Sequence, residues 1–203
     1  GAAQTFTATV RPVPTMTDPQ DVGKCVGEPI AVTFSGTPTA TYNWTNSNSD
    51  IGLPASGTGS SISFSGQTPT SAAQTAVITV TPSIGACPGP PQTFNIAISP
   101  APTVNPVPSQ TMCGSLPLSV LFSGSSPTTV YQWTNNNTAT GVPASGTGNI
   151  NITLGAPGTN QTSVLTVTPV DAGCSGQPQT FNINVNAVEG VNPTPNQASC
   201  GNQ

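Results

Sequence analysis

Short runs in which apolar and polar residues alternate recur along the whole chain, separated by turn-forming residues. Val, Ile, Thr and Phe dominate these runs, and the two-residue period places every second side chain on one face. No stretch shows the period of an amphipathic helix. The pattern predicts an all-β protein built from many short strands, with clear examples at Ile30–Phe34, Tyr42–Trp44, Ile78–Val80 and Gln92–Ile98.

The strand pattern is written twice. The stretch WTNSNSDIGLPASGTG (Trp44–Gly59) returns as WTNNNTATGVPASGTG (Trp133–Gly148), and most positions are identical. Aligning these stretches brings the rest of the chain into register, and repeats of about 88 residues are large enough to be domains. We expect Ig-like repeats at residues 12–99 and 100–187, the last strand of a preceding repeat at 1–11, and the start of a further repeat at 188–203.

Both ends of the chain match internal parts of the repeats. Gly1–Val10 has the alternation of Gln92–Ile98 and Gln179–Val185, the strands that close each repeat. The final residues, VNPTPNQASCGNQ, copy the opening of the second repeat, VNPVPSQTMCGSL. Proline-rich linkers restrict φ and favour extended chain, so consecutive repeats are expected to form a semi-rigid rod. We therefore expect the chain to be a window onto a longer array.

Each repeat carries about six or seven predicted strands and one tryptophan, which is typical of an antiparallel Ig-like β-sandwich. The two-residue period places Tyr42 and Trp44 on the inward face and Asn43 toward solvent. We interpret Trp44 and Trp133 as core anchors; the alternative is that their rings stack on a sugar. The PASGTG segment after each tryptophan has too many turn formers to be expected as regular structure.

Charge is nearly absent from the 203 residues, whose formal net charge is −4. Arg11 and Lys24 are the two cations, too few to displace the counterions of a nucleic acid or to bind an anionic membrane. No apolar run approaches the roughly 18 residues that span a bilayer. Neither nucleic acid nor membrane insertion is expected.

Catalytic residues are also missing from the pattern. The chain has no histidine, so no Ser-His-Asp or Cys-His arrangement and no histidine metal ligand can form. The GTG of each repeat lacks the lysine and helix of a phosphate-binding loop and is interpreted as a tight turn. No enzyme activity, metal or cofactor is expected, because none of the six acidic residues recurs at the equivalent place in the other repeat: Asp18, Asp21, Glu28, Asp50, Asp171 and Glu189.

The disulfide candidates are five cysteines that occupy two positions of the repeat: Cys25, Cys87, Cys113, Cys174 and Cys200. Paired cysteines in small domains indicate an oxidising compartment. Spacing favours bonds within each repeat, Cys25–Cys87 and Cys113–Cys174. Strand counting supports an alternative, Cys25–Cys174, because the two loops of one sandwich would lie at opposite ends, beyond the Cα separation of about 4.4–6.8 Å that a disulfide needs.

The order of motifs in each repeat resembles that of a known family. A cysteine beside glycine is followed by Tyr-x-Trp-Thr-Asn, ASGTG, a V-T-P segment, a second cysteine among glycines, Thr-Phe and a proline-rich exit. This order resembles the PKD-like, Ig-like repeats of very large secreted bacterial surface proteins, and the resemblance covers essentially the whole chain. It implies tandem Ig-like sandwiches in extracellular adhesins and fibres. PKD domains carry Asp-Phe-Gly-Asp-Gly after this tryptophan, whereas Thr and Asn follow it here, so no calcium site is expected.

Together these features predict a non-catalytic structural segment of a long extracellular rod, filament or cell-surface adhesin. Its expected partners are neighbouring repeats or identical subunits in a fibre, and surface glycans. The alternative function is that of carbohydrate-binding accessory modules of a secreted enzyme. Four Asn-x-Ser/Thr sequons are candidate glycosylation sites, at Asn43, Asn136, Asn151 and Asn160.

Overall fold

The computed structural model describes residues 3–5, 7, 10, 12–69 and 72–188. Cys200, Glu189 and most of the expected further repeat at 188–203 lie outside these residues. The strand expected at Gly1–Val10 falls partly outside them, and the described part of it, residues 3–5, 7 and 10, lies in no strand. The described structure is therefore essentially that of the two repeats.

The strands that the alternation predicts occur in the first repeat in the expected order. Between them lie further short strands that the alternation does not predict. The eight strands of this repeat are β1 (Val22–Cys25), β2 (Pro29–Thr33), β3 (Thr41–Asn46), β4 (Ser56–Thr58), β5 (Ser61–Ser65), β6 (Gln74–Ile84), β7 (Cys87–Pro88) and β8 (Gln92–Ser99). A 3₁₀ turn, η1 (Ser49–Ile51), separates β3 from β4. No α-helix occurs in the part of the chain that the structure describes.

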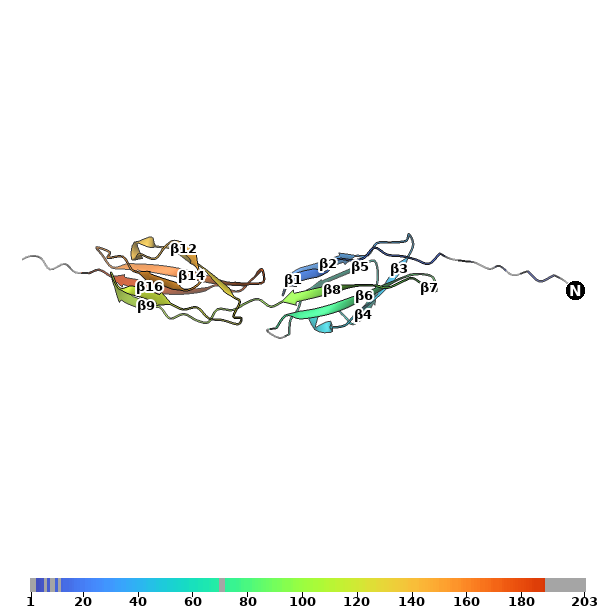
Figure 1. Ribbon diagram of the computed structural model, residues 1–203, viewed down its shortest axis with the longest axis horizontal. Helices are drawn as coiled ribbons and strands as arrows, with labels where there is room; N and C mark the ends of the chain where they lie inside the picture. Colours follow the sequence, from blue (N-terminus) through green and yellow to red (C-terminus); the bar gives the residue numbers. More distant parts are fainter. Residues whose placement is uncertain (1–2, 6, 8–9, 11, 70–71, 189–203) are drawn as a thin grey trace, which may run out of the picture. The chain divides into compact units, whose positions relative to one another are not determined.

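Two sheets make up the sandwich. The larger has the order β1-β8-β6-β3-β4, with β7 paired to β6, and the smaller is the antiparallel pair β2-β5. Figure 1 shows β2 and β5 on one side of β6 and β8 within this repeat. All pairs are antiparallel except β1 with β8, in which Val22 is opposite Ile96 and Cys25 is opposite Ser99. The fold is thus an all-β sandwich of the Ig-like kind, as the alternation predicts.

The core lies between the two sheets and is built from the inward positions of each strand. β6 shows the pattern most clearly, because every second residue from Ala76 to Pro82 is buried. Burial of such side chains contributes about 1.5–3 kcal/mol each, which is the main stabilising term in a domain of this size. The aromatic part of the core is a contact between Phe34 and Tyr42 and an edge-on contact between Phe34 and Phe94.

The second repeat has the same order of strands. They are β9 (Gln110–Cys113), β10 (Pro117–Val120), β11 (Val130–Asn135), β12 (Ser145–Thr147), β13 (Ile150–Thr153), β14 (Gln161–Asp171), β15 (Cys174–Ser175) and β16 (Gln179–Asn186). A 3₁₀ turn, η2 (Thr138–Thr140), again precedes the short strand β12. Its larger sheet has the order β12-β11-β14-β16-β9 and its smaller sheet is β10-β13.

The chain divides into two compact units that follow the repeats with one exception. The first unit contains Gly1–Pro102, and the second contains Thr103–Val170 and Gly176–Gln203. The segment Asp171–Ser175, the tip of the β14–β15 hairpin, groups with the first unit although it belongs to the second repeat in sequence.

The structure corrects one expectation about local structure. Residues of the PASGTG segment form a strand in each repeat, β4 and β12, at the edge of the larger sheet. Trp44 is opposite Gly57, and Trp133 is opposite Gly146. The glycine is therefore not a turn residue: it pairs with the tryptophan strand where a side chain would overlap the indole ring.

Candidate functional site

The most strongly repeated stretch, Trp44–Gly59, forms one continuous supersecondary unit. It leaves β3 at Asn46, turns through η1, and returns antiparallel as β4. Asn48 is the N-cap of η1, and its side chain accepts a hydrogen bond from the backbone N–H of Asp50. Gly52 ends the turn in the left-handed region, with φ of 93°, where glycine has no steric penalty. The same unit occurs at η2 with Asn137 and Gly141.

A buried asparagine organises this loop from inside. Asn46 is 9% exposed, and its Nδ2 donates to the carbonyls of Leu53 at 2.8 Å and Pro54 at 3.3 Å. Its Oδ1 accepts from the backbone N–H of Asn48 at 3.0 Å. Asn135 repeats the arrangement, donating to the carbonyl of Val142 at 2.8 Å. These asparagine side chains bind the loop itself, and their hydrogen-bonding groups are engaged in holding its shape.

Replacing Asn46 with alanine is expected to lower the free energy of unfolding by about 1–3 kcal/mol, because the buried carbonyl of Leu53 loses its donor. Denaturant titration followed by tryptophan fluorescence measures this loss. Asn43→Ala is the matched control: Asn43 is exposed on the same strand, so its replacement should change stability by no more than about 0.5 kcal/mol. Equal losses for the two variants would contradict the assigned role.

The two tryptophans lie in the core. Trp44 is 8% exposed and Trp133 is 7% exposed, and each belongs to the hydrophobic cluster of its repeat. A ring buried to this extent presents no free face on which a sugar can stack. Their indole nitrogens differ, however. Trp133 Nε1 donates to the carbonyl of Gly148 at 3.1 Å, whereas Trp44 Nε1 is buried without a hydrogen-bond partner among the described residues.

This difference predicts unequal effects of the same substitution. Trp133→Phe removes a hydrogen bond, while Trp44→Phe removes an N–H group that is already buried and unpaired. We expect Trp133→Phe to cost about 1 kcal/mol more than Trp44→Phe. Amide hydrogen exchange of β11 and β3 reports the two repeats separately. Equal costs, or the reverse order, would contradict the assignment.

The outer face of each larger sheet carries rows of hydroxyl groups. In the first repeat Ser56, Thr45, Thr79 and Thr93 are opposite one another on four neighbouring strands. In the second repeat the same face has a depression of about 300 Å³ whose lining has no charged side chain. Its hydroxyl and amide groups, which would suit an uncharged polar ligand, come from the exposed Gln132, Thr134, Ser145 and Thr147 and from the half-buried Thr166 and Thr168.

Acidic side chains do not gather into a site. Among the described residues no group of three or more His, Cys, Asp or Glu side chains is placed to hold a metal ion. Asp21 accepts hydrogen bonds from the backbone N–H of Asn95 at 2.7 Å and from its side chain at 3.1 Å. These bonds, the backbone one foremost, hold the pKa of Asp21 below its ordinary value. In the second repeat Ser109 Oγ accepts from the N–H of Asn182, so the role is one of fastening a strand edge.

Burial raises the pKa of the hydroxyl of Tyr131, a residue that belongs to the core cluster of the second repeat.

The four sequon asparagines are all exposed. Asn136 Oδ1 accepts from the backbone N–H of Val164, and Asn160 Oδ1 accepts from that of Ala187. Modification of Asn43, Asn136, Asn151 and Asn160 stays a prediction. No helix among the described residues has the length and apolar character needed to cross a membrane.

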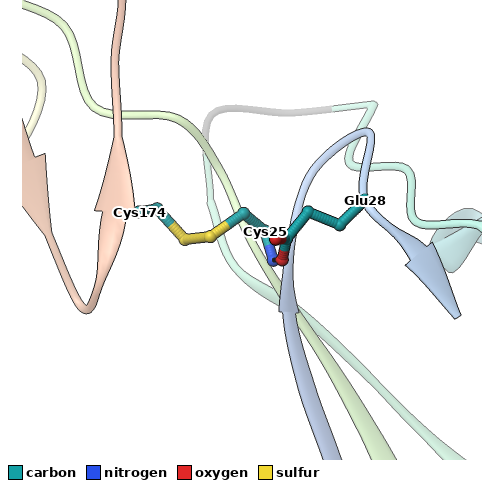
Figure 2. The surroundings of a disulfide bond; sticks show 3 residues. All are labelled: Cys25, Glu28 and Cys174. Atoms are coloured by element: carbon teal, nitrogen blue, oxygen red, sulfur yellow. Dashed lines mark hydrogen bonds between the residues drawn. A yellow bond between two sulfur atoms is a disulfide. The ribbon is translucent and has the colours of Figure 1, made fainter.

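A disulfide joins Cys25 to Cys174, with a Cα–Cα distance of 5.6 Å (Figure 2). Cys25 is the last residue of β1. Its backbone N–H donates to Glu28 Oε2 at 2.8 Å, and its carbonyl accepts from the N–H of Glu28 at 3.1 Å. Cys174 begins β15, after a hairpin tip in which Ala172 and Gly173 have positive φ. The bond therefore connects a strand end of the first repeat to a hairpin tip that comes from the second.

The favoured pairing within repeats is wrong, and the alternative that strand counting supports is confirmed. Cys87 lies just before β8 begins at Gln92, whereas Cys25 is opposite Ser99 at the other end of β8. Eight residues of strand separate these ends by roughly 25 Å. A bond between Cys25 and Cys87 would have to cross the length of the sandwich. Cys87 and Cys113 are free.

No protein-family model matches the chain, and no curated protein matches it. Solved structures do match. The I-band fragment I67-I69 from titin superposes with a TM-score of 0.53 at 11% identity, covering 88% of this chain and 66% of the fragment. An E-to-A mutated variant of the titin domains I67-I69 gives 0.50 at 13% identity, covering 85% of this chain and 65% of that one. The chain thus spans slightly less than two thirds of these fragments, and at such low identity the likeness establishes the tandem Ig-like fold alone.

Proposed function

We propose that this chain is a structural segment of a long extracellular rod, filament or cell-surface adhesin built from Ig-like repeats. The observation that carries the proposal is the disulfide between Cys25 and Cys174. It joins two different positions of the repeat, taken from two successive copies. Such a bond serves a continuous array, because each repeat offers one position to the repeat before it and the other to the repeat after it.

The chemistry of the repeated stretch supports the same function. Its polar side chains hold the loop: Asn46 and Asn48 bond to backbone groups, and Trp44 lies in the core. What the repetition preserves is therefore the geometry of a module. A module whose repeated residues maintain its shape suits a protein that provides length and an ordered surface, and no catalytic role is proposed for it.

The disulfide also supports an extracellular or cell-surface location. Such bonds form and persist where the surroundings are oxidising, and cytosolic thiols are kept reduced. The proposed partners are neighbouring repeats or identical subunits of the same fibre. The resemblance to PKD-like repeats of secreted bacterial surface proteins agrees with this proposal.

Electron microscopy of the protein isolated from its native source tests the proposal directly. Rods or filaments with a regular axial repeat are expected, and antibodies against this chain should label intact, unpermeabilised cells. Compact particles, or labelling only after permeabilisation, would overturn it.

The hydroxyl-lined depression on β11, β12 and β14 favours a second candidate function, the binding of an uncharged carbohydrate. A glycan array on the two-repeat chain tests it. Replacing Thr134 and Thr168 with valine should abolish binding if the depression is the site, while Thr45→Val on the first repeat serves as the matched control. Without binding to the unmodified chain, this candidate function is excluded for the glycans on the array.

A further inference from the structure

We propose that the two free cysteines are the halves of a second disulfide of the same kind, in which Cys113 of one chain bonds to Cys87 of a second copy of this chain. The inference rests on the proposed structural role and names the site through which copies join. We call residues 24–28, the end of β1 and the turn that follows it, the first seat, and the tip Asp171–Ser175 the bonded plug. The equivalent residues 112–116 around Cys113 are the second seat, and the equivalent residues 84–88 at the β6–β7 tip, which carry Cys87, are the free plug.

The two seats have the same backbone structure. Cys25 is opposite Ser99 in a parallel ladder, and Cys113 is opposite Asn186 in the equivalent ladder. The next residue closes each turn onto the same carbonyl: the N–H of Val26 donates to Ser99 at 2.9 Å, and that of Gly114 donates to Asn186 at 3.0 Å. The residue after that has positive φ in both, 85° at Gly27 and 65° at Ser115. The backbone around Cys113 thus has the same conformation as the backbone around the disulfide-bonded Cys25.

The two plugs also match. Cys87 and Cys174 each begin a short strand that pairs back onto the end of the preceding long strand. The hairpins are closed by equivalent bonds, from the N–H of Gly89 to the carbonyl of Pro82 at 2.8 Å and from Gly176 to Pro169 at 2.9 Å. Positive φ occurs at the tip of each, including Gly85 in the free plug. Cys87 therefore occupies the same position in its hairpin as the disulfide-bonded Cys174 occupies in the second repeat.

Burial distinguishes the bonded half from the free one. Cys174 is 2% exposed, whereas its equivalent Cys87 is only partly buried. Cys113 is exposed, while its equivalent Cys25 is partly buried. In the bonded pair the seat and plug cover each other's sulfur. The free pair consists of an exposed Cys113 and a half-buried Cys87, one cysteine of each type, and these are the two halves needed to form the same bond with a further chain.

The residues beside the cysteines match within each pair. The first seat carries Lys24 immediately before its cysteine and Glu28 three residues after it, and the bonded plug carries Asp171, so both members of the bonded pair are charged. In the second seat the position of Lys24 is held by Met112, and in the free plug the position of Asp171 is held by Ile84. Leu116, which replaces Glu28 in the second seat, is 46% exposed. Met112 packs partly against the core of its own repeat, so Leu116 is the exposed apolar side chain of the second seat. Leu116 and Ile84 are thus apolar where the bonded seat and plug are charged, and mixed pairings would place charged groups against apolar ones.

The union is head-to-tail, because a seat bonds a plug and never another seat. A heterologous contact of this kind continues from copy to copy and builds an open chain. Formation of the bond needs an oxidant, which we take to be a small disulfide such as oxidised glutathione. The Cys113 thiolate attacks it and releases one glutathione thiolate; the Cys87 thiolate then attacks the Cys113 sulfur, forming the protein disulfide and releasing the second. Two thiols are oxidised, one disulfide is reduced, and the two protons that the protein thiols lose are taken up by the two glutathione thiolates.

Disulfide exchange between two variants of the 203-residue chain tests the proposal. Both carry Cys200→Ser; one adds Cys113→Ser and keeps the free plug, and the other adds Cys87→Ser and keeps the second seat. They are mixed in a glutathione redox buffer, and peptide mapping under non-reducing conditions identifies the bonds. We expect the Cys87–Cys113 disulfide to predominate far above its statistical proportion over the two symmetric dimers, with Cys25–Cys174 intact in both chains as the check on folding.

The matched control moves the thiol off the seat. In the second variant Cys113 becomes serine, and Thr111, which is two residues earlier on β9 and likewise exposed, becomes cysteine. This chain should yield only the statistical mixture. A statistical mixture from the Cys113 chain as well, or thiols that remain unpaired, would overturn the pairing while leaving the rod to be judged by microscopy. Compact native particles would overturn the rod and leave the pairing to be judged by this mapping.

Discussion

Stretched from its two ends in a force spectrometer, the oxidised chain is expected to release only a small part of its length. The Cys25–Cys174 bond spans 149 residues of sequence, a contour of about 500 Å at roughly 3.4 Å per residue. Strands β2 to β14 all lie inside this covalent loop. Tension passes through the bond between the two sulfur atoms and does not load the strands inside the loop, because a covalent bond withstands forces that separate hydrogen-bonded strands. Adding a reductant should make the additional length of about 500 Å appear.

Matched cysteine variants identify the bond responsible. Cys174→Ser should release the full length without reductant, whereas Cys87→Ser and Cys113→Ser should behave as the parent chain does, because those thiols are free. Full extension of the oxidised parent would show that the bond does not carry the tension. In a longer array, bonds of this kind would limit extension at each repeat, which is what a rod that must keep its length requires.

Truncating the core tryptophan is expected to cause the largest loss of stability of any single substitution considered for the first repeat. Trp44→Ala should lower the free energy of unfolding by about 3–5 kcal/mol, because the ring belongs to the buried cluster and its removal leaves a cavity. Gly57→Ala should cost about 1–3 kcal/mol for the opposite reason, because the added methyl group overlaps the indole ring. Denaturant midpoints measured by circular dichroism give both values.

A double-mutant cycle separates this contact from a general intolerance of β4 to alanine. Once the ring is gone, the methyl group at Gly57 has room, so Gly57→Ala should cost much less in the Trp44→Ala background. Gly23→Ala is the control, because a methyl group there meets no atom within 4 Å. Strictly additive losses, or a Gly57→Ala variant as stable as Gly23→Ala, would contradict the assigned packing.

These contacts explain which local expectations failed. The PASGTG segment has the composition of a turn, yet Ser56–Thr58 pairs with β3 because a glycine opposite the tryptophan is the condition for placing the ring there. Strand β1 is equally hard to predict, since VGKC has little alternation and gains its structure by pairing in parallel with β8. In both cases hydrogen bonding to a distant strand decides the conformation, and local pattern carries little of that information.

In the asparagine-rich turn, too, local composition predicts one part of the structure and the folded chain decides the other. Its composition is enough to predict a turn, because Asn and Gly favour caps and positive φ. The identity of the carbonyls that Asn46 holds depends on how the chain returns from η1 to β4. The sequence therefore indicates that these residues shape a loop, and the folded chain shows how.

By itself, the sequence determined the two repeats, the all-β sandwich and the inward position of Trp44 and Trp133, because alternation and repetition are local properties of the chain. Only the tertiary structure decided the partner of each cysteine. A disulfide needs two Cα atoms within a few ångströms, and which strand ends meet depends on the register of β1 against β8 and on the place of the β14–β15 tip. Spacing along the chain favoured partners at opposite ends of one sandwich, and the folded chain joined successive copies instead.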